Sequence, residues 1–145
     1  MATAQAAPPS IYPCLYYMDA VAAIQWLSRV FGFETTMQVK GDDESVHAEM
    51  RYGNGGIMLG TAKGPWASPL DLPKKHACIY IYVGDAMALE AHYKHTVSQG
   101  AKLERELQDT FYGSKEYSAY DLEGNSWSFG TYLPSDAPAG DTAAA

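Results

Sequence analysis

The sequence predicts an α+β fold built from two βαβββ modules. Segments 47–61 and 117–131 each read as a strand, a Gly/Asn turn and a second strand, and each ends in Gly-Thr. The same order of elements precedes both segments: a strand, a helix and another strand. Because one such module cannot bury its sheet alone, we expect the two copies to pack together.

The first module is predicted over about residues 10–62. A strand rich in aromatic residues covers 11–19, and Asp19 stands where a helix N-cap is expected. The helix that follows ends at Gly32, and a strand over 33–40 and a turn over 41–44 lead into the hairpin. Five apolar residues at helical spacing predict the buried face of this helix: Ala20, Ala23, Ile24, Leu27 and Phe31.

The second module, about residues 76–133, repeats the plan. A strand over 77–83 precedes Asp85, which is again the expected N-cap, and a helix from Ala86 ends at Gly100. A strand over 101–109 and a loop over 111–115 complete the approach to the hairpin. Prolines and a glycine mark residues 63–75 as a linker, and residues 1–9 and 134–145 are expected to be disordered tails of a single domain over 10–133.

Composition narrows the class of protein. The chain has 145 residues and a net charge of −7, which makes nucleic acid a poor partner and is compatible with a cationic ligand or simply with solubility. No apolar run is long enough to predict a membrane span, and the N-terminus lacks the pattern of a secretory signal. Cys14 and Cys78 are the only cysteines, too few for a disulfide framework. We therefore expect a cytoplasmic protein.

The ordered motifs resemble the vicinal oxygen chelate superfamily, which includes glyoxalase I, bleomycin-resistance proteins and extradiol dioxygenases. The resemblance covers about residues 10–133 and is carried by four motifs: "FGFE", "HAEMRYGNGGIML", "VGD…HY…GAK" and "FYGSKEYSAYDLEGNSWSF". It implies curved half-barrel sheets with helices on the convex side and a ligand in the concave cup. It also implies a homodimer.

The resemblance implies four positions for a divalent metal: one on the first strand and one on the last strand of each module. These positions fall at or near Tyr12 and at Cys78 and Ser128, with Glu49 as the expected first-half carboxylate and His76 on the same strand face as Cys78. A phenol and a hydroxyl hardly complete an octahedral site, so we expect no cofactor. If a metal binds, Glu49 and His76 are its expected ligands.

Glu49 alternates with Met50, so it is expected to face the cup. It is a candidate general base or a partner for a cationic group of a ligand. Alternatively, it only forms a hydrogen bond to the neighbouring strand. His47 shares its face, either as an orienting partner or as one more polar residue on the wetter side of the sheet. Aligned on the repeat, the second hairpin carries Tyr117 and Ala119 at these two positions.

Aromatic strand residues are the other candidates for a ligand site. Alternation sends about half of them to the cup and half to the core, where they serve only in packing. The ligand-binding residues we predict are Tyr12, His47, Glu49, Cys78, Tyr80, Tyr112 and Trp127. The thiol of Cys78 is otherwise expected to be inert and buried, and His92 and His95 to serve in helix packing or at the surface.

Two functions remain open. One is a binding protein that holds a small organic ligand, cationic or aromatic, as the bleomycin-resistance branch does. The alternative is a metal-dependent lyase or isomerase of the glyoxalase I type, or a dioxygenase. A third and weaker reading is a metal-free enzyme that uses Glu49 or a tyrosine as acid and base.

Overall fold

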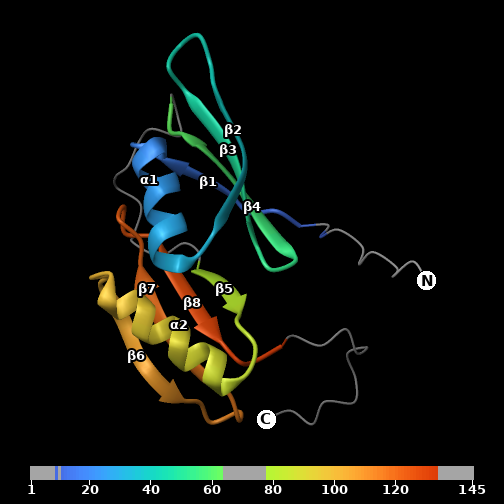
Figure 1. The fold of residues 1–145 in the computed structure, drawn as a ribbon, viewed down its shortest axis with the longest axis vertical. Coiled ribbons are helices and arrows are strands. Elements are labelled where there is room, and N and C mark those ends of the chain that lie inside the picture. Colours follow the sequence, from blue (N-terminus) through green and yellow to red (C-terminus); the bar gives the residue numbers. More distant parts are fainter. Residues whose placement is uncertain (1–8, 10, 64–77, 134–145) are drawn as a thin grey trace, which may run out of the picture.

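The computed structural model describes residues 9, 11–63 and 78–133, which form two βαβββ modules (Figure 1). The proposed linker, most of both proposed tails, and His76 lie outside the described residues. None of the helices in the described part of the chain has the length and apolar character needed to cross a membrane. The predicted fold class is confirmed, with two separate four-stranded sheets.

The first module carries its helix on one face of its sheet. Its strands are β1 (Cys14–Tyr17), β2 (Glu34–Lys40), β3 (Val46–Tyr52) and β4 (Gly55–Thr61), in the order β1-β4-β3-β2. The helix α1 (Ala20–Trp26) continues as the π-helical turn η1 (Leu27–Phe31). Asp19 caps it by accepting a hydrogen bond from the Ala22 amide at 3.0 Å, and Gly32 ends it with a φ of +87°. All five predicted helix core residues are buried.

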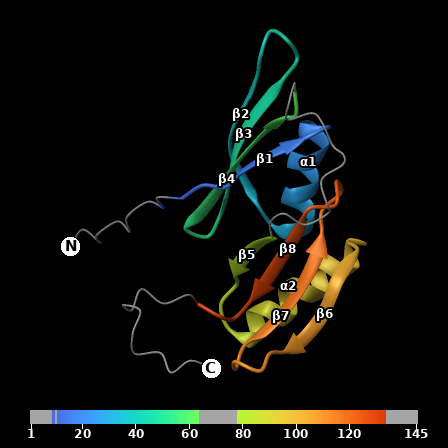
Figure 2. The ribbon, with the colours of Figure 1, turned by 180° about the vertical axis from the view of Figure 1, so that it is seen from behind.

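The second module has the same topology. Its strands are β5 (Cys78–Tyr82), β6 (Leu103–Asp109), β7 (Lys115–Tyr120) and β8 (Ser126–Gly130), in the order β5-β8-β7-β6. The helix α2 (Ala86–Ser98) is capped by Asp85, which accepts a hydrogen bond from the Ala88 amide at 2.9 Å. This helix crosses in front of β6 and β7 in Figure 1 and behind them in Figure 2.

One aromatic cluster joins the two modules on the helix side of the sheets. Phe31 at the end of η1 is fully buried, and its ring lies 5.5 Å from Trp127 and 4.9 Å from Phe129 of the second module, centroid to centroid. Phe33 meets the Trp127 ring edge-on, also at 5.5 Å. The two modules therefore share one hydrophobic core.

The loop between β7 and β8 reaches back to the first module. Asp121 is 5% exposed and accepts hydrogen bonds from the Tyr17 hydroxyl at 2.7 Å and the Trp127 indole at 3.0 Å. The carboxylate of Glu123 accepts hydrogen bonds from the Met18 and Asp19 amides at 2.8 and 3.0 Å, just ahead of α1. Burial, followed by the negative charge of Asp121, raises the pKa of Tyr17. The second module thus fixes where the first helix begins.

Two histidines of α2 contact the end of the first helix. His92 Nε2 lies 2.9 Å from the Phe31 carbonyl oxygen, so this nitrogen carries the proton, and Nδ1 accepts from the Tyr117 hydroxyl. His95 Nε2 lies 3.0 Å from the Arg29 carbonyl oxygen. Both histidines serve in helix packing, one of the two roles expected from the sequence.

The His92 contacts predict a pH-dependent stability. Burial lowers the pKa of His92 in the folded protein, although its bond to the Phe31 carbonyl partly opposes this. As the pH falls, His92 is therefore protonated in the unfolded chain before it is protonated in the folded protein. The free energy of unfolding falls between about pH 6.5 and the pKa of His92 in the folded protein, by at most about 1.4 kcal/mol per pH unit. Urea midpoints at about pH 7.5 and about pH 5.5 should differ less for His92→Gln than for the wild type. The exposed His47→Gln variant is the control, and equal pH dependence in all three proteins would contradict the prediction.

Candidate functional site on the helix-free faces

Glu49 and His47 lie on the helix-free face of the first sheet. Ala48 and Met50, which alternate with them on β3, are buried under α1. His47 Nε2 lies 4.0 Å from Glu49 Oε1, and each side chain is about half exposed. The expected orientation of Glu49 is therefore observed, and the two polar side chains lie close enough to act together.

A pocket of about 320 Å³ opens on this face beside Glu49. Its lining includes the predicted residues Tyr12 and Glu49, together with Thr36, Arg51 and Met58. The Tyr12 ring lies over Gly56, where an added Cβ would be only 3.0 Å from the ring. Glycine at this position therefore lets an aromatic ring lie close against the strand, where it forms one wall of the pocket.

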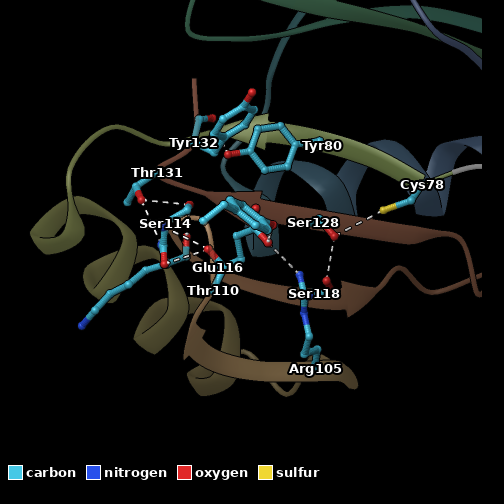
Figure 3. A network of polar contacts seen from close by, with 12 residues as sticks. Cys78, Tyr80, Arg105, Thr110, Ser114, Glu116, Ser118, Ser128, Thr131 and Tyr132 are labelled. Carbon is cyan, nitrogen blue, oxygen red and sulfur yellow. Dashed lines mark hydrogen bonds and ion pairs between the residues drawn. The ribbon is translucent and has the colours of Figure 1, made fainter. Parts of the chain in front are cut away.

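The helix-free face of the second sheet carries a network of polar side chains (Figure 3). The Cys78 Sγ and Ser128 Oγ atoms are 3.3 Å apart, and Ser128 Oγ lies 2.7 Å from Ser118 Oγ. Cys78 is exposed, which corrects the expectation of a buried thiol: the first residue of the edge strand β5 points away from the helix. The side chains of Tyr80, Glu116, Ser118 and Ser128 share this face in Figure 3.

Glu116 is a buried carboxylate on this face that the sequence analysis missed. Its Oε2 atom accepts hydrogen bonds from the Tyr112 hydroxyl at 2.6 Å and from Arg105 Nη2 at 3.2 Å. The hydrogen bond to Glu116, followed by burial, raises the pKa of Tyr112. Burial, followed by the charge of Glu116, raises the pKa of Tyr80 to about 12. Both phenols therefore stay protonated near neutral pH.

The strand pairing shows that the two hairpins align with an offset of one residue. Thr61 accepts a hydrogen bond from the Val46 amide, and Thr131 accepts the same bond from the Lys115 amide, both at 3.0 Å. His47 is paired with Gly60 and Glu116 with Gly130, so Glu116 is the counterpart of His47. The expected equivalence with Tyr117 and Ala119 is wrong, because both of these residues face the core.

The offset comes from the turns. The paired residues Arg51 and Gly56 enclose four residues, 52–55, whereas their counterparts Tyr120 and Ser126 enclose five, 121–125. The sequence alignment gave both hairpins the same length of fifteen residues ending in Gly-Thr, and so it shifted β7 by one residue. Polar residues at alternating positions in "KEYSAY", Glu116 and Ser118, were the signal that could have corrected it.

The same register reassigns the positions at which the resemblance places metal ligands. Ser128 is paired with Ser118, and Met58 with Glu49, so Met58 is the first-module counterpart of Ser128. The last-strand position of the first module therefore holds Met58, and Glu49 lies opposite it on β3. Tyr12, Met58, Cys78 and Ser128 offer a phenol, a thioether, a thiol and a hydroxyl.

This donor set does not fit a hard divalent metal, which favours carboxylate, imidazole and carbonyl ligands. Among residues 9, 11–63 and 78–133, no group of three or more His, Cys, Asp or Glu side chains is placed to hold an ion. His76, the other proposed ligand, lies outside this part of the chain.

The remaining predicted ligand-binding residues lie on different faces of the second sheet. Tyr80 lies on the helix-free face of the second sheet, where its hydroxyl donates to the Tyr132 carbonyl at 2.5 Å. Tyr112 reaches the same face through its hydrogen bond to Glu116. Trp127 does not: it is 0% exposed, faces the helices and donates its indole N–H to Asp121. Its position in the core follows from the alternation of β8, in which Ser126 and Ser128 take the opposite face.

Comparison with known proteins agrees with this architecture. No curated protein matches the chain. Among solved structures, TioX from Micromonospora sp. ML1 is 25% identical, with a TM-score of 0.67 over 89% of this chain and 100% of that chain. A glyoxalase/bleomycin resistance protein/dioxygenase from Nocardioides is 13% identical, with a TM-score of 0.69 over 96% of this chain and 93% of that chain.

A lactoylglutathione lyase from Agrobacterium tumefaciens is 20% identical, with a TM-score of 0.63 over 86% of this chain and 95% of that chain. At this identity the likeness describes the fold. A family model matches residues 11–129, which include both modules. The chain therefore belongs to the Glyoxalase/Bleomycin resistance protein/Dioxygenase superfamily.

Proposed function

We propose that this protein binds a small planar or cationic organic ligand in the cup lined by the helix-free faces. The observation that carries the proposal is the donor set at the four metal positions as the strand register assigns them, Tyr12, Met58, Cys78 and Ser128, which lacks any carboxylate or imidazole. A member of this superfamily with such a set has lost the usual means of polarising a substrate oxygen. Binding without metal-assisted chemistry is the function that these side chains serve best.

Aromatic side chains and a carboxylate give this cup its chemistry. Tyr12 and Tyr80 present rings on the helix-free faces of the first and second sheets, and Tyr112 adds a third. Aromatic rings supply a large contact area with little loss of side-chain entropy, and their faces attract cations. Glu49, with His47 beside it, provides a carboxylate for a positive or hydrogen-bond-donating group of the ligand. Cys78 completes the proposed set at the edge of the second face.

The carboxylate of Glu49 is the first part of the proposal to test. Glu49→Gln keeps the shape of the side chain and removes its charge, so a cationic ligand should bind about 1–3 kcal/mol more weakly. Titration with cationic glycopeptides, aromatic metabolites and glutathione adducts, followed by tryptophan fluorescence, measures the change. Glu106→Gln makes the same charge change at an exposed position of β6 and should leave the affinity unaltered. An unchanged affinity in Glu49→Gln would remove this residue from the site.

Metal content provides an independent test. We expect dialysed protein to hold no stoichiometric nickel, zinc or iron, since a phenol, a thioether, a thiol and a hydroxyl bind such ions poorly together. Elemental analysis measures this directly. One tightly held ion per chain, or rapid metal-dependent isomerisation of a hemithioacetal, would replace the binding function with that of a glyoxalase-type lyase. The homodimer and the cytoplasmic location stay predictions from the sequence.

A further inference from the structure

Three aromatic rings form an exposed corner at one end of the second module. Phe111 and Tyr112 lie in the loop between β6 and β7, and Tyr132 follows β8. These side chains are 91%, 47% and 48% exposed. The Phe111 and Tyr112 rings meet at 89° with centroids 5.0 Å apart, and the Tyr112 and Tyr132 rings meet at 80° with centroids 5.8 Å apart. Successive rings therefore turn their faces at nearly right angles to one another.

A buried carboxylate lies behind the rings of this corner. The Tyr112 hydroxyl donates a hydrogen bond of 2.6 Å to Glu116, which is 5% exposed. Donation to a carboxylate shifts electron density into the phenol ring and strengthens its attraction for a cation. Arg105 shares the same carboxylate oxygen at 3.2 Å and offsets part of its charge. The corner thus combines ring faces with a negative charge held behind them.

Gly130 makes this arrangement possible. A Cβ atom at this position would lie 2.7 Å from Glu116 Cγ and 2.7 Å from the Tyr80 hydroxyl. The absence of a side chain therefore lets Tyr80 and Glu116 approach each other across β8. Figure 3 shows Tyr80 and Tyr132 side by side above Glu116. The Tyr80 hydroxyl fixes the position of Tyr132 by donating to its carbonyl.

We propose that the corner formed by Phe111, Tyr112 and Tyr132 is a binding site for an alkylated ammonium group. Such a group spreads its charge over methyl surfaces, so it loses little hydration when it rests against ring faces set at right angles. The carboxylate of Glu116 and the net charge of −7 favour a cation over a neutral apolar group of the same shape. The site shares Tyr112 with the proposed ligand cup but goes beyond the proposed function, because Glu49 and the pocket of the first module play no part in it.

The test uses choline and its neutral isostere, 3,3-dimethylbutan-1-ol, on the full chain. Choline should bind, and ring currents should move its trimethyl proton resonance upfield, whereas the isostere should show a much smaller effect. Phe111→Leu, Tyr112→Leu and Tyr132→Leu should each weaken choline binding by about two- to fivefold. Phe111 is so exposed that its substitution leaves the fold intact. Glu116→Gln should weaken choline binding and leave the isostere unaffected.

Two controls separate this site from the proposed ligand cup. Tyr16→Leu removes a half-exposed ring of the first module, and Glu106→Gln removes an exposed carboxylate of β6; neither should change choline binding. Weaker choline binding in Glu49→Gln would place choline in the proposed ligand cup and overturn the proposal. Equal binding of choline and the isostere would overturn the proposal, as would unchanged affinity in the three leucine variants. A fall in oligomeric mass of Phe111→Leu by light scattering, with choline binding unaltered, would also overturn it and assign the rings to a contact between copies of the chain.

Discussion

Phe31→Ala should lower the free energy of unfolding by about 3–5 kcal/mol, as expected when a fully buried aromatic ring is removed. Phe31 ends the first helix, yet its ring packs on Trp127 and Phe129 of the second module. The cavity left by the substitution would therefore open between the modules, where neither sheet can close it alone. Urea unfolding followed by circular dichroism measures the loss as a lower midpoint.

Phe111→Ala is the matched control for this experiment. It removes the same ring from a position that is 91% exposed, so its effect on stability should stay within about 0.5 kcal/mol. Similar losses in the two variants would show that the shared core between the modules contributes little to stability.

Asp121→Ala should cost about 3 kcal/mol for a different reason. The substitution leaves the Tyr17 hydroxyl and the Trp127 indole N–H, both in fully buried side chains, without their acceptor. Each buried donor that loses its partner costs about 1–3 kcal/mol. The same carboxylate also accepts hydrogen bonds from the backbone amides of Glu123 and Asn125, so the loop 121–125 loses these two hydrogen bonds as well.

The Asp121 prediction is checked by urea denaturation with Asp42→Ala as the control, since Asp42 lies in the exposed turn after β2. Asp121→Asn should cost less than Asp121→Ala, because the amide keeps one oxygen as an acceptor. A loss below about 1 kcal/mol in Asp121→Ala would show that the buried donors find other acceptors.

Those parts of the fold that depend on local pattern could be predicted from sequence. Asp19 and Asp85 cap the two helices as expected, because an aspartate before an apolar helical run has a specific hydrogen bond to make. Helical spacing identified the buried face from Ala20 to Phe31, and alternation gave the orientation of Glu49. In each case the decisive interaction lies within a few residues of the pattern.

The second half of the site could not be predicted in this way, because it depends on pairing between strands. Glu116 was missed because the length of the loop before β8 sets the register of β7, and the sequence alignment assumed two hairpins of equal length. Trp127 was assigned to the ligand site although Ser126 and Ser128 occupy that face. Tyr112 was predicted as a ligand residue, but its bond to Glu116 depends on how a loop folds over the sheet.

The five-residue loop at 121–125 also means that the two modules are not interchangeable parts. A chain assembled from two copies of the first module would have the short turn Gly53–Asn54 in place of this loop. That turn has no carboxylate that could accept hydrogen bonds from the start of a neighbouring helix. Only the second copy carries Glu123 to receive the Met18 and Asp19 amides and Asp121 to receive Tyr17. The second module therefore positions the start of the first helix through a loop that the first module does not contain. The helix-free faces lie on the other side of the sheets from this attachment, so they can diverge towards new ligands without loosening it.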